Sequence, residues 1–196
     1  MMTDSVQGVE RHPLEPFVPD RARLLMLGSF PPARHRWCMD FFYPNFNNDM
    51  WRIFGLCLHG DRHYFVDEEN HTFRREAIER MLHQQGIAIY DTAEAVIRTK
   101  NTASDKDLQV VRPTDIKLLM GRMPALRAIV TTGEKATSLA AEQLGVDMPK
   151  VGCFVDCPWG GGTIRFYRMP SSSRAYPMKV ERKAEYYKVV FGNIFI

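Results

Sequence analysis

The sequence predicts an α/β fold, a three-layer α/β/α sandwich with a central, mainly parallel four-stranded sheet. Short apolar runs with the length of buried strands alternate along the chain with amphipathic stretches of helical length. Strands that alternate with helices form a parallel sheet with helices on both faces, because each crossover returns the chain over the sheet. The 196 residues are enough for one such domain with a substantial core.

Four stretches have the pattern of sheet strands. Three are short and almost wholly apolar, and a Gly or an Asp ends each of them, as expected for buried parallel strands. The fourth alternates apolar and polar residues. In chain order, the expected strands are residues 23–27, 86–90, 128–131 and 163–168.

Five stretches have the apolar spacing of amphipathic helices. Asp49, Thr72 and Thr114 stand where N-caps are expected, and Gly86 and Gly145 stand where two helices should stop. The expected helices begin near Met50, cover residues 75–85, run from Thr114 through Leu119, cover residues 135–144 and cover residues 180–191.

The remaining segments are expected to be irregular. Residues 1–20 contain three prolines and no periodicity, so they are expected to form a surface lead-in to a single domain over residues 21–196. Residues 61–71 and 99–111 are polar, and residues 157–162, which include Pro158 and three glycines, are expected to form a turn.

Composition indicates an intracellular protein with no membrane partner. No apolar run is long enough to cross a bilayer, and the N-terminus lacks the basic start and apolar stretch of a secretory signal. We therefore expect a cytoplasmic location, associated with the nucleoid if the source is bacterial.

Positive charge is concentrated near the C-terminus. The net charge of the chain is only +3, but residues 165–183 contain six bases and one acid, so the rest of the chain carries −2. A phosphate-facing surface requires such a concentration of bases. A solvated helix face explains the last three bases equally well.

The four cysteines are interpreted as ordinary thiols. Only Cys153 and Cys157 are close in sequence, whereas Cys38 and Cys57 fall near an apolar strand and a helix. A metal or an iron–sulfur cluster is the alternative. We expect no metal and no other cofactor.

Aromatic and amide side chains follow the first strand. After Gly28, Pro31 and Pro32 prevent further sheet pairing. The aromatic and amide residues of the following loop are Phe41, Phe42, Tyr43, Asn45, Asn47, Asn48 and Trp51. Rings stack on the faces of a nucleobase, and amides match the donors and acceptors of its edge. The loop is therefore suited to a planar polar ligand.

A second loop, residues 169–177, follows the last strand. It holds three serines, an arginine and a tyrosine between Pro170 and Pro177, and small hydroxyl residues allow close approach to phosphates. The alternative is a plain serine-rich turn. Because ligands bind beyond the carboxyl ends of parallel strands, this loop, residues 28–48 and the segment after Asp91 are expected at one edge.

Together these motifs resemble the uracil-DNA glycosylase superfamily. Gly-Ser-Phe-Pro after a strand, Tyr43, Asn48-x-x-Trp51 and the later Pro170-Ser171 follow that superfamily's order, and the mismatch-specific uracil and hypoxanthine branches are the most similar. The likeness spans roughly residues 24–187. It implies an enzyme that binds double-stranded DNA with a damaged or mismatched base, flips out uracil or hypoxanthine and hydrolyses its N-glycosidic bond.

The resemblance also implies roles for individual residues. Asn48 matches a catalytic position, and Tyr43 matches the ring that stacks on the flipped base; the alternatives are a helix cap and core packing. Asp49 and Asp91 are the nearby carboxylates that could activate water. The expected base pocket is Gly28, Ser29, Phe30, Pro31 and Tyr43. The expected DNA-binding residues are Pro170, Ser171, Ser172, Ser173 and Arg174, with Ser173 and Arg174 where a wedge inserts into the duplex.

The sequence departs from the superfamily's pattern in three places. Phe30 stands where many relatives have a water-activating Asp or Asn, and Pro32 replaces a commoner Gly. Met169 stands where efficient uracil enzymes have a His that stabilises the departing base anion. These departures put strong uracil activity in doubt. Two alternatives to a DNA glycosylase stay open. One is a non-catalytic module that binds nucleic acid or a free base, and the other is an enzyme that acts on free nucleosides or nucleotides. We expect a monomer.

Overall fold

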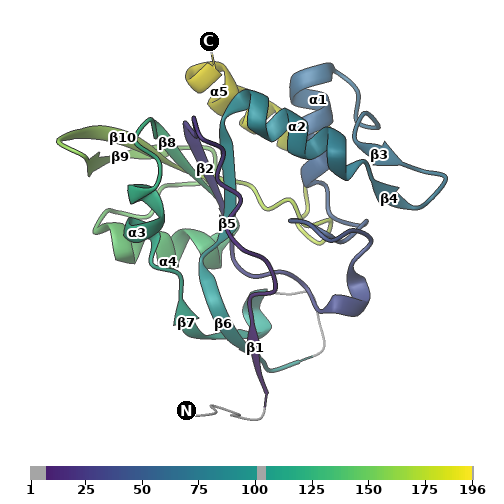
Figure 1. Cartoon of the computed structure of the whole chain (residues 1–196), viewed down its shortest axis with the longest axis horizontal. Helices are drawn as coiled ribbons and strands as arrows, with labels where there is room; N and C mark the ends of the chain where they lie inside the picture. The colour runs from purple at the N-terminus through teal and green to yellow at the C-terminus, as the bar shows by residue number, and fades with distance from the viewer. Residues whose placement is uncertain (1–7, 101–104, 196) are drawn as a thin grey trace.

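The computed structural model describes residues 8–100 and 105–195, and its centre is a mixed five-stranded sheet (Figure 1). The strand order is β5-β2-β8-β10-β9. The bounds are β2 Leu24–Gly28, β5 Ile87–Asp91, β8 Ala128–Thr132, β9 Phe154–Trp159 and β10 Gly162–Met169. Four strands are parallel and coincide with the four that the sequence predicts. The expectation of only four strands is wrong, because β9 pairs antiparallel with β10 and adds a fifth.

The second half of strand β9 falls within residues 157–162, where a turn was expected. The turn itself is confined to Gly160 and Gly161, whose φ values of 58° and 79° lie in the left-handed region that glycine adopts without strain. Pro158 is compatible with β9 because this strand lies at the edge of the sheet.

Helices cover both faces of the central sheet. Figure 1 shows α1 (Met50–His59), α2 (Arg75–Gln85) and α5 (Val180–Phe195) on one side, and α3 (Ile116–Gly121) and α4 (Glu134–Leu144) on the other. The three-layer arrangement agrees with the sequence prediction. Within the described residues, no helix combines the length and apolar character needed to cross a membrane.

The glycines that end two helices were predicted better than the N-cap residues. Gly86 and Gly145 end α2 and α4 in left-handed conformation, as expected. Two of the three expected N-caps are wrong, and the third, Asp49, does stand at the N-cap position of α1. Thr72 belongs to a short strand, β4 (Thr72–Phe73), which pairs with β3 (Val66–Asp67). Asp115 rather than Thr114 caps α3 by accepting from the Leu118 N–H, and the Asp49 side chain makes no cap hydrogen bond.

A second, antiparallel sheet forms below the carboxyl edge of the central one (Figure 1). It consists of β1 (Val9–Arg11), β6 (Ala93–Arg98) and β7 (Leu108–Pro113), in the order β1-β6-β7. Parts of the expected irregular segments 1–20 and 99–111 are therefore strands. Neither segment has strand periodicity of its own, and each is ordered by pairing with β6. The short helices η1 (Arg34–Arg36) and η2 (Asp105–Asp107) complete the fold.

Candidate active site

A cavity of about 290 Å³ lies at the carboxyl edge of the central sheet. Gly28 ends β2, Asp91 ends β5 and Thr132 ends β8, and all three line it together with residues 171–175 after β10. In the sheet, β5 and β8 lie on opposite sides of β2. The strand order therefore reverses direction at β2, which makes this edge a topological switch point. Ligands of open α/β sheets bind at such points, and the cavity is near the lower limit of ligand pockets in size.

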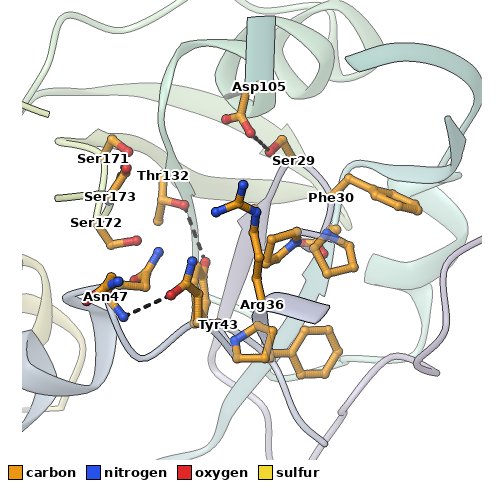
Figure 2. A pocket seen from close by; sticks show the side chains of 18 of the residues that line it. Ser29, Phe30, Arg36, Tyr43, Asn47, Asp105, Thr132, Ser171, Ser172 and Ser173 are labelled. Carbon is orange, nitrogen blue, oxygen red and sulfur yellow. Dashed lines mark hydrogen bonds between the residues drawn. The ribbon is translucent and has the colours of Figure 1, made fainter. Parts of the chain in front are cut away.

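Tyr43 forms one wall of the cavity in a strained backbone conformation. Its φ is +49°, a value that a non-glycine residue adopts rarely and mainly at functional sites. Its hydroxyl lies 3.3 Å from Thr132 Oγ1, and a dashed line in Figure 2 marks this hydrogen bond. Burial and the neighbouring Asp91 raise the pKa of this hydroxyl, so Tyr43 stays neutral. The Tyr43 ring is half-buried and packs edge-to-face on Trp51. Core packing therefore accounts for one side of the ring, as the alternative interpretation expected.

Gly28 has to be a glycine because Asp91 covers it. A Cβ at Gly28 would lie 2.4 Å from Asp91 Oδ1 and 3.5 Å from the Tyr43 hydroxyl. The other carboxylate oxygen, Oδ2, lies 2.9 Å from Nε2 of His12, whose side chain is only 2% exposed. The absence of a side chain at Gly28 therefore lets the Asp91 carboxylate lie over the end of β2.

We expect Gly28→Ala to lower the free energy of unfolding by about 1–3 kcal/mol, the usual effect of overpacking a closed site. The new methyl has to displace the Asp91 carboxylate from its contact with His12. Urea unfolding measures the change. Gly192→Ala is the matched control, because a Cβ there meets nothing within 4 Å on helix α5. Equal stability of the two variants would contradict the close packing at Gly28.

Asn48 lines the cavity and also stabilises the start of helix α1 from the position before the N-cap residue. Its Oδ1 accepts a hydrogen bond of 2.9 Å from the Met50 N–H, so the cap alternative is right for the oxygen. The amide nitrogen is the part of the side chain that can donate to a ligand. Of the two polar atoms of this side chain, Oδ1 therefore has a structural hydrogen bond.

Asp49 does not line the cavity. It is 5% exposed, and its two oxygens accept from Lys183 Nζ at 2.9 Å and from Arg174 Nε at 3.2 Å. Lys183 is fully buried and also donates to the Ser173 carbonyl at 2.8 Å. Both oxygens of the carboxylate are engaged by cations, so the expectation that Asp49 activates water lacks geometric support.

The two sequence-predicted loops meet directly. Asn48 and Ser173 form an antiparallel bridge, and the Asp49 N–H donates to the Ser172 carbonyl at 2.9 Å. Arg174 contacts the first loop as well, donating to Asp49 and to Asn47 Oδ1. The guanidinium expected to act as a wedge is thus folded back onto the first loop.

The remaining predicted residues occupy different surroundings. Ser171, Ser172 and Ser173 line the cavity, and Ser171 Oγ accepts from the Ser173 N–H. Pro170 does not line it; its carbonyl accepts from the buried Tyr187 hydroxyl at 3.1 Å. Pro31 forms part of the lining.

Ser29 and Phe30 contribute to the cavity in different ways. The Ser29 hydroxyl donates to Asp105 Oδ1 at 2.7 Å. The Phe30 ring points away from the cavity centre (Figure 2) and packs in a small cluster with Ala93, Val96 and Leu108. A stacking role for this ring is therefore excluded, while its backbone stays at the cavity wall.

Sequence reasoning missed Asp105, a second carboxylate in the cavity wall. It lies in the segment that was expected to be irregular, and no motif marked it. Burial raises its pKa, and the nearby Asp91 raises it further, while the Ser29 hydrogen bond acts in the opposite direction. The cavity therefore combines two carboxyl groups, and the surroundings of Asp105 favour its protonated form.

Arg36 and Arg98 were missed as well. Arg98 pairs with both oxygens of Glu10 at 2.9 Å and donates to the Pro31 carbonyl. Arg36, on η1, extends its guanidinium into the cavity toward Ser29 and Thr132 (Figure 2). Its buried Nε has no hydrogen-bond partner among the described residues.

The four cysteines lie apart from the cavity lining. Cys38 and Cys57 are half-buried, Cys153 is exposed and Cys157 is buried. Burial raises the pKa of Cys57 to about 12, which disfavours the thiolate that metals bind. Within residues 8–100 and 105–195, no group of three or more His, Cys, Asp or Glu side chains could hold a metal ion.

Comparison with known proteins gives a likeness of fold. No protein-family model matches the sequence, and no curated protein matches it. The chain is similar to the solution NMR structure of a "putative Uracil DNA glycosylase" from Methanosarcina acetivorans, with a TM-score of 0.64 and 20% sequence identity. The match covers 96% of this chain and 99% of that one. The chain therefore shares the fold of that protein over nearly its whole length.

Proposed function

We propose that this protein is a monofunctional DNA glycosylase of the uracil-DNA glycosylase superfamily, which removes a deaminated base in base excision repair. The meeting of the two loops at Asn48 and Ser173 carries the proposal, because it places a half-buried ring, an amide donor and a carboxylate around one cavity. The fold shared with the archaeal protein agrees with it. Uracil and hypoxanthine are the proposed bases.

The reaction needs a water, a base for its proton and stabilisation of the departing nucleobase. The bond between C1′ and the base nitrogen breaks, and its electron pair leaves with the base as an anion. The water oxygen bonds to C1′, and its proton passes to Asp91. Asp91 suits this role because it lines the cavity and its Oδ2 is already held by His12. The base anion takes a proton from solvent after release.

The base is recognised by an aromatic ring and by hydrogen-bond donors in the cavity wall. The Tyr43 ring stacks on the base, and the Asn48 amide nitrogen donates to its edge. The backbone N–H groups of Ser29 and Phe30 are further donors at the cavity wall.

Double-stranded DNA is the proposed partner, bound by a monomer. Ser171, Ser172 and Ser173 contact the phosphates that flank the flipped nucleotide, and the side chain of Arg174, 46% exposed, adds positive charge beside them. Pro170 holds the loop against Tyr187 through its carbonyl oxygen, which accepts from the Tyr187 hydroxyl.

An incision assay tests the function. Duplexes with uracil, hypoxanthine or xanthine at one position are incubated with excess protein, and abasic sites are cleaved with alkali. We expect abasic product from at least one of them. DNA binding without product would favour the binding module, and hydrolysis of free nucleosides without action on DNA would favour the nucleoside enzyme.

Asn48→Asp separates the catalytic role of Asn48 from its structural one. Asp keeps the oxygen that caps α1 but replaces the amide donor with a charged oxygen. We expect the single-turnover excision rate to fall by about 10²–10³-fold, as when one donor to a developing anion is removed, while the melting temperature stays near that of the wild type.

Two further variants complete the comparison. Asn48→Ala loses donor and cap together and should also lose about 1 kcal/mol of stability. Asn193→Ala, at an exposed position of α5, should match the wild type in both measurements. Full excision by Asn48→Asp would show that the amide donor takes no part.

A further inference from the structure

The departing base needs hydrogen-bond donors or positive charge, and in this chain the superfamily's usual position supplies neither. Met169 stands where efficient uracil enzymes have a His, and it is only 1% exposed and does not line the cavity. Two carboxyl groups, Asp91 and Asp105, do line the cavity. An anion that forms beside them is unfavourable unless a positive group is close to it.

Three arginines line the cavity, and two are committed elsewhere. Arg98 is held by the Glu10 carboxylate and the Pro31 carbonyl. Arg174 is held by Asp49 and Asn47. Arg36 has no ion pair and no side-chain hydrogen bond within the described part of the chain, and its Nε is buried.

The position of Arg36 suits contact with a base. Arg36 is the last residue of η1, which follows Pro31 and Pro32 in the chain. Its guanidinium reaches into the cavity between Ser29 on one side and Thr132 on the other (Figure 2). The cavity of about 290 Å³ is the space that remains with this side chain in place. The terminal N–H groups of this guanidinium face the cavity, so a ligand that accepts from them would give Arg36 the partner that the described residues do not.

We propose that Arg36 is a catalytic residue that donates to the departing nucleobase and stabilises its negative charge as the glycosidic bond breaks. This inference rests on the proposed function. The electron pair of the C1′–N bond moves to the base, and Arg36 transfers no proton; it supplies charge-assisted hydrogen bonds to the anion. It thereby replaces the missing His from a different loop of the fold.

The dependence of the rate on the leaving group tests this role. A base that is a stronger acid carries negative charge more easily and therefore needs Arg36 less. The test compares uracil with 5-fluorouracil, or hypoxanthine with xanthine, in duplex DNA under single-turnover conditions, for the wild type, Arg36→Met and Arg36→Lys.

We expect Arg36→Met to slow excision of the less acidic base by about 10²-fold, and of the more acidic base by only about 10-fold. Arg36→Lys, which retains the charge without the planar fork, should recover part of the loss. The matched control is Arg80→Met, an exposed arginine of α2, which should not change either rate. The ratio of the two rates is measured within one preparation, so partial misfolding cannot create it.

The outcomes separate this inference from the function on which it rests. A wild type that excises none of these bases removes the proposed function. An active wild type with Arg36→Met unchanged, or slowed equally on both bases, overturns the role of Arg36 alone. Should Arg36→Met fail to fold, Arg36→Gln gives the same ratio with a neutral side chain that keeps polar character.

Discussion

Replacing Lys183 with Met is expected to lower the free energy of unfolding by about 3–5 kcal/mol, the effect of removing one partner of a buried ion pair. Lys183 is fully buried, and its ammonium contacts Asp49 Oδ2 and the Ser173 carbonyl. In the variant, the buried Asp49 carboxylate retains only Arg174, whose side chain is 46% exposed. Urea unfolding at pH 7 measures the loss.

The same contacts join the two loops of the candidate site, so the loss should extend beyond stability. Lys183 lies on α5, Asp49 lies before α1 and Ser173 belongs to the serine-rich loop. We expect the variant to bind DNA more weakly even where it is fully folded. Lys188→Met, an exposed lysine on the same helix, is the control.

A double variant separates charge from packing. In Asp49→Asn with Lys183→Met, no buried carboxylate remains without its partner, so much of the lost stability should return. If Lys183→Met alone unfolds at the wild-type urea concentration, the ion pair does not stabilise the junction between the loops.

The sequence predicted the parts of the fold whose pattern is local. The β2, β5 and β8 strands are fully buried apolar runs, and buried runs are recognisable without knowledge of their neighbours. Strands β1 and β9 have no such pattern. Each lies at the edge of its sheet and depends on one partner, β6 or β10, which the local sequence does not identify.

The same difference between local patterns and long-range contacts decides which features of the candidate site could be predicted. Asn48, Tyr43 and the serine loop, which line one cavity, could be proposed from the sequence because they stand in recognisable motifs next to strand ends. The ion pair of Asp49 could not be predicted, because its partner Lys183 is 134 residues away in the chain. Asp105 and Arg36 were missed because neither has a motif, and only the folded chain brings them to one cavity.

Asp91→Asn should lower the single-turnover excision rate by about 10²–10⁴-fold, the range that a general base contributes. Asn has nearly the same shape, and its amide oxygen can still accept from His12, so the fold and DNA binding should be kept. The rate is measured on the base identified by the incision assay. Asp147→Asn, at an exposed position, is the matched control.

Asp105→Asn decides which of the two carboxyl groups in the cavity receives the proton of water. Burial and the charge of Asp91 raise the pKa of Asp105, which favours its protonated form, and Asn resembles a protonated acid more than a carboxylate. Asp105→Asn should therefore reduce the excision rate less than Asp91→Asn does. The opposite ranking would transfer the role of base to Asp105. Asp91, held by His12, would then act only through its charge, which raises the pKa of Asp105 and so makes Asp105 the stronger base.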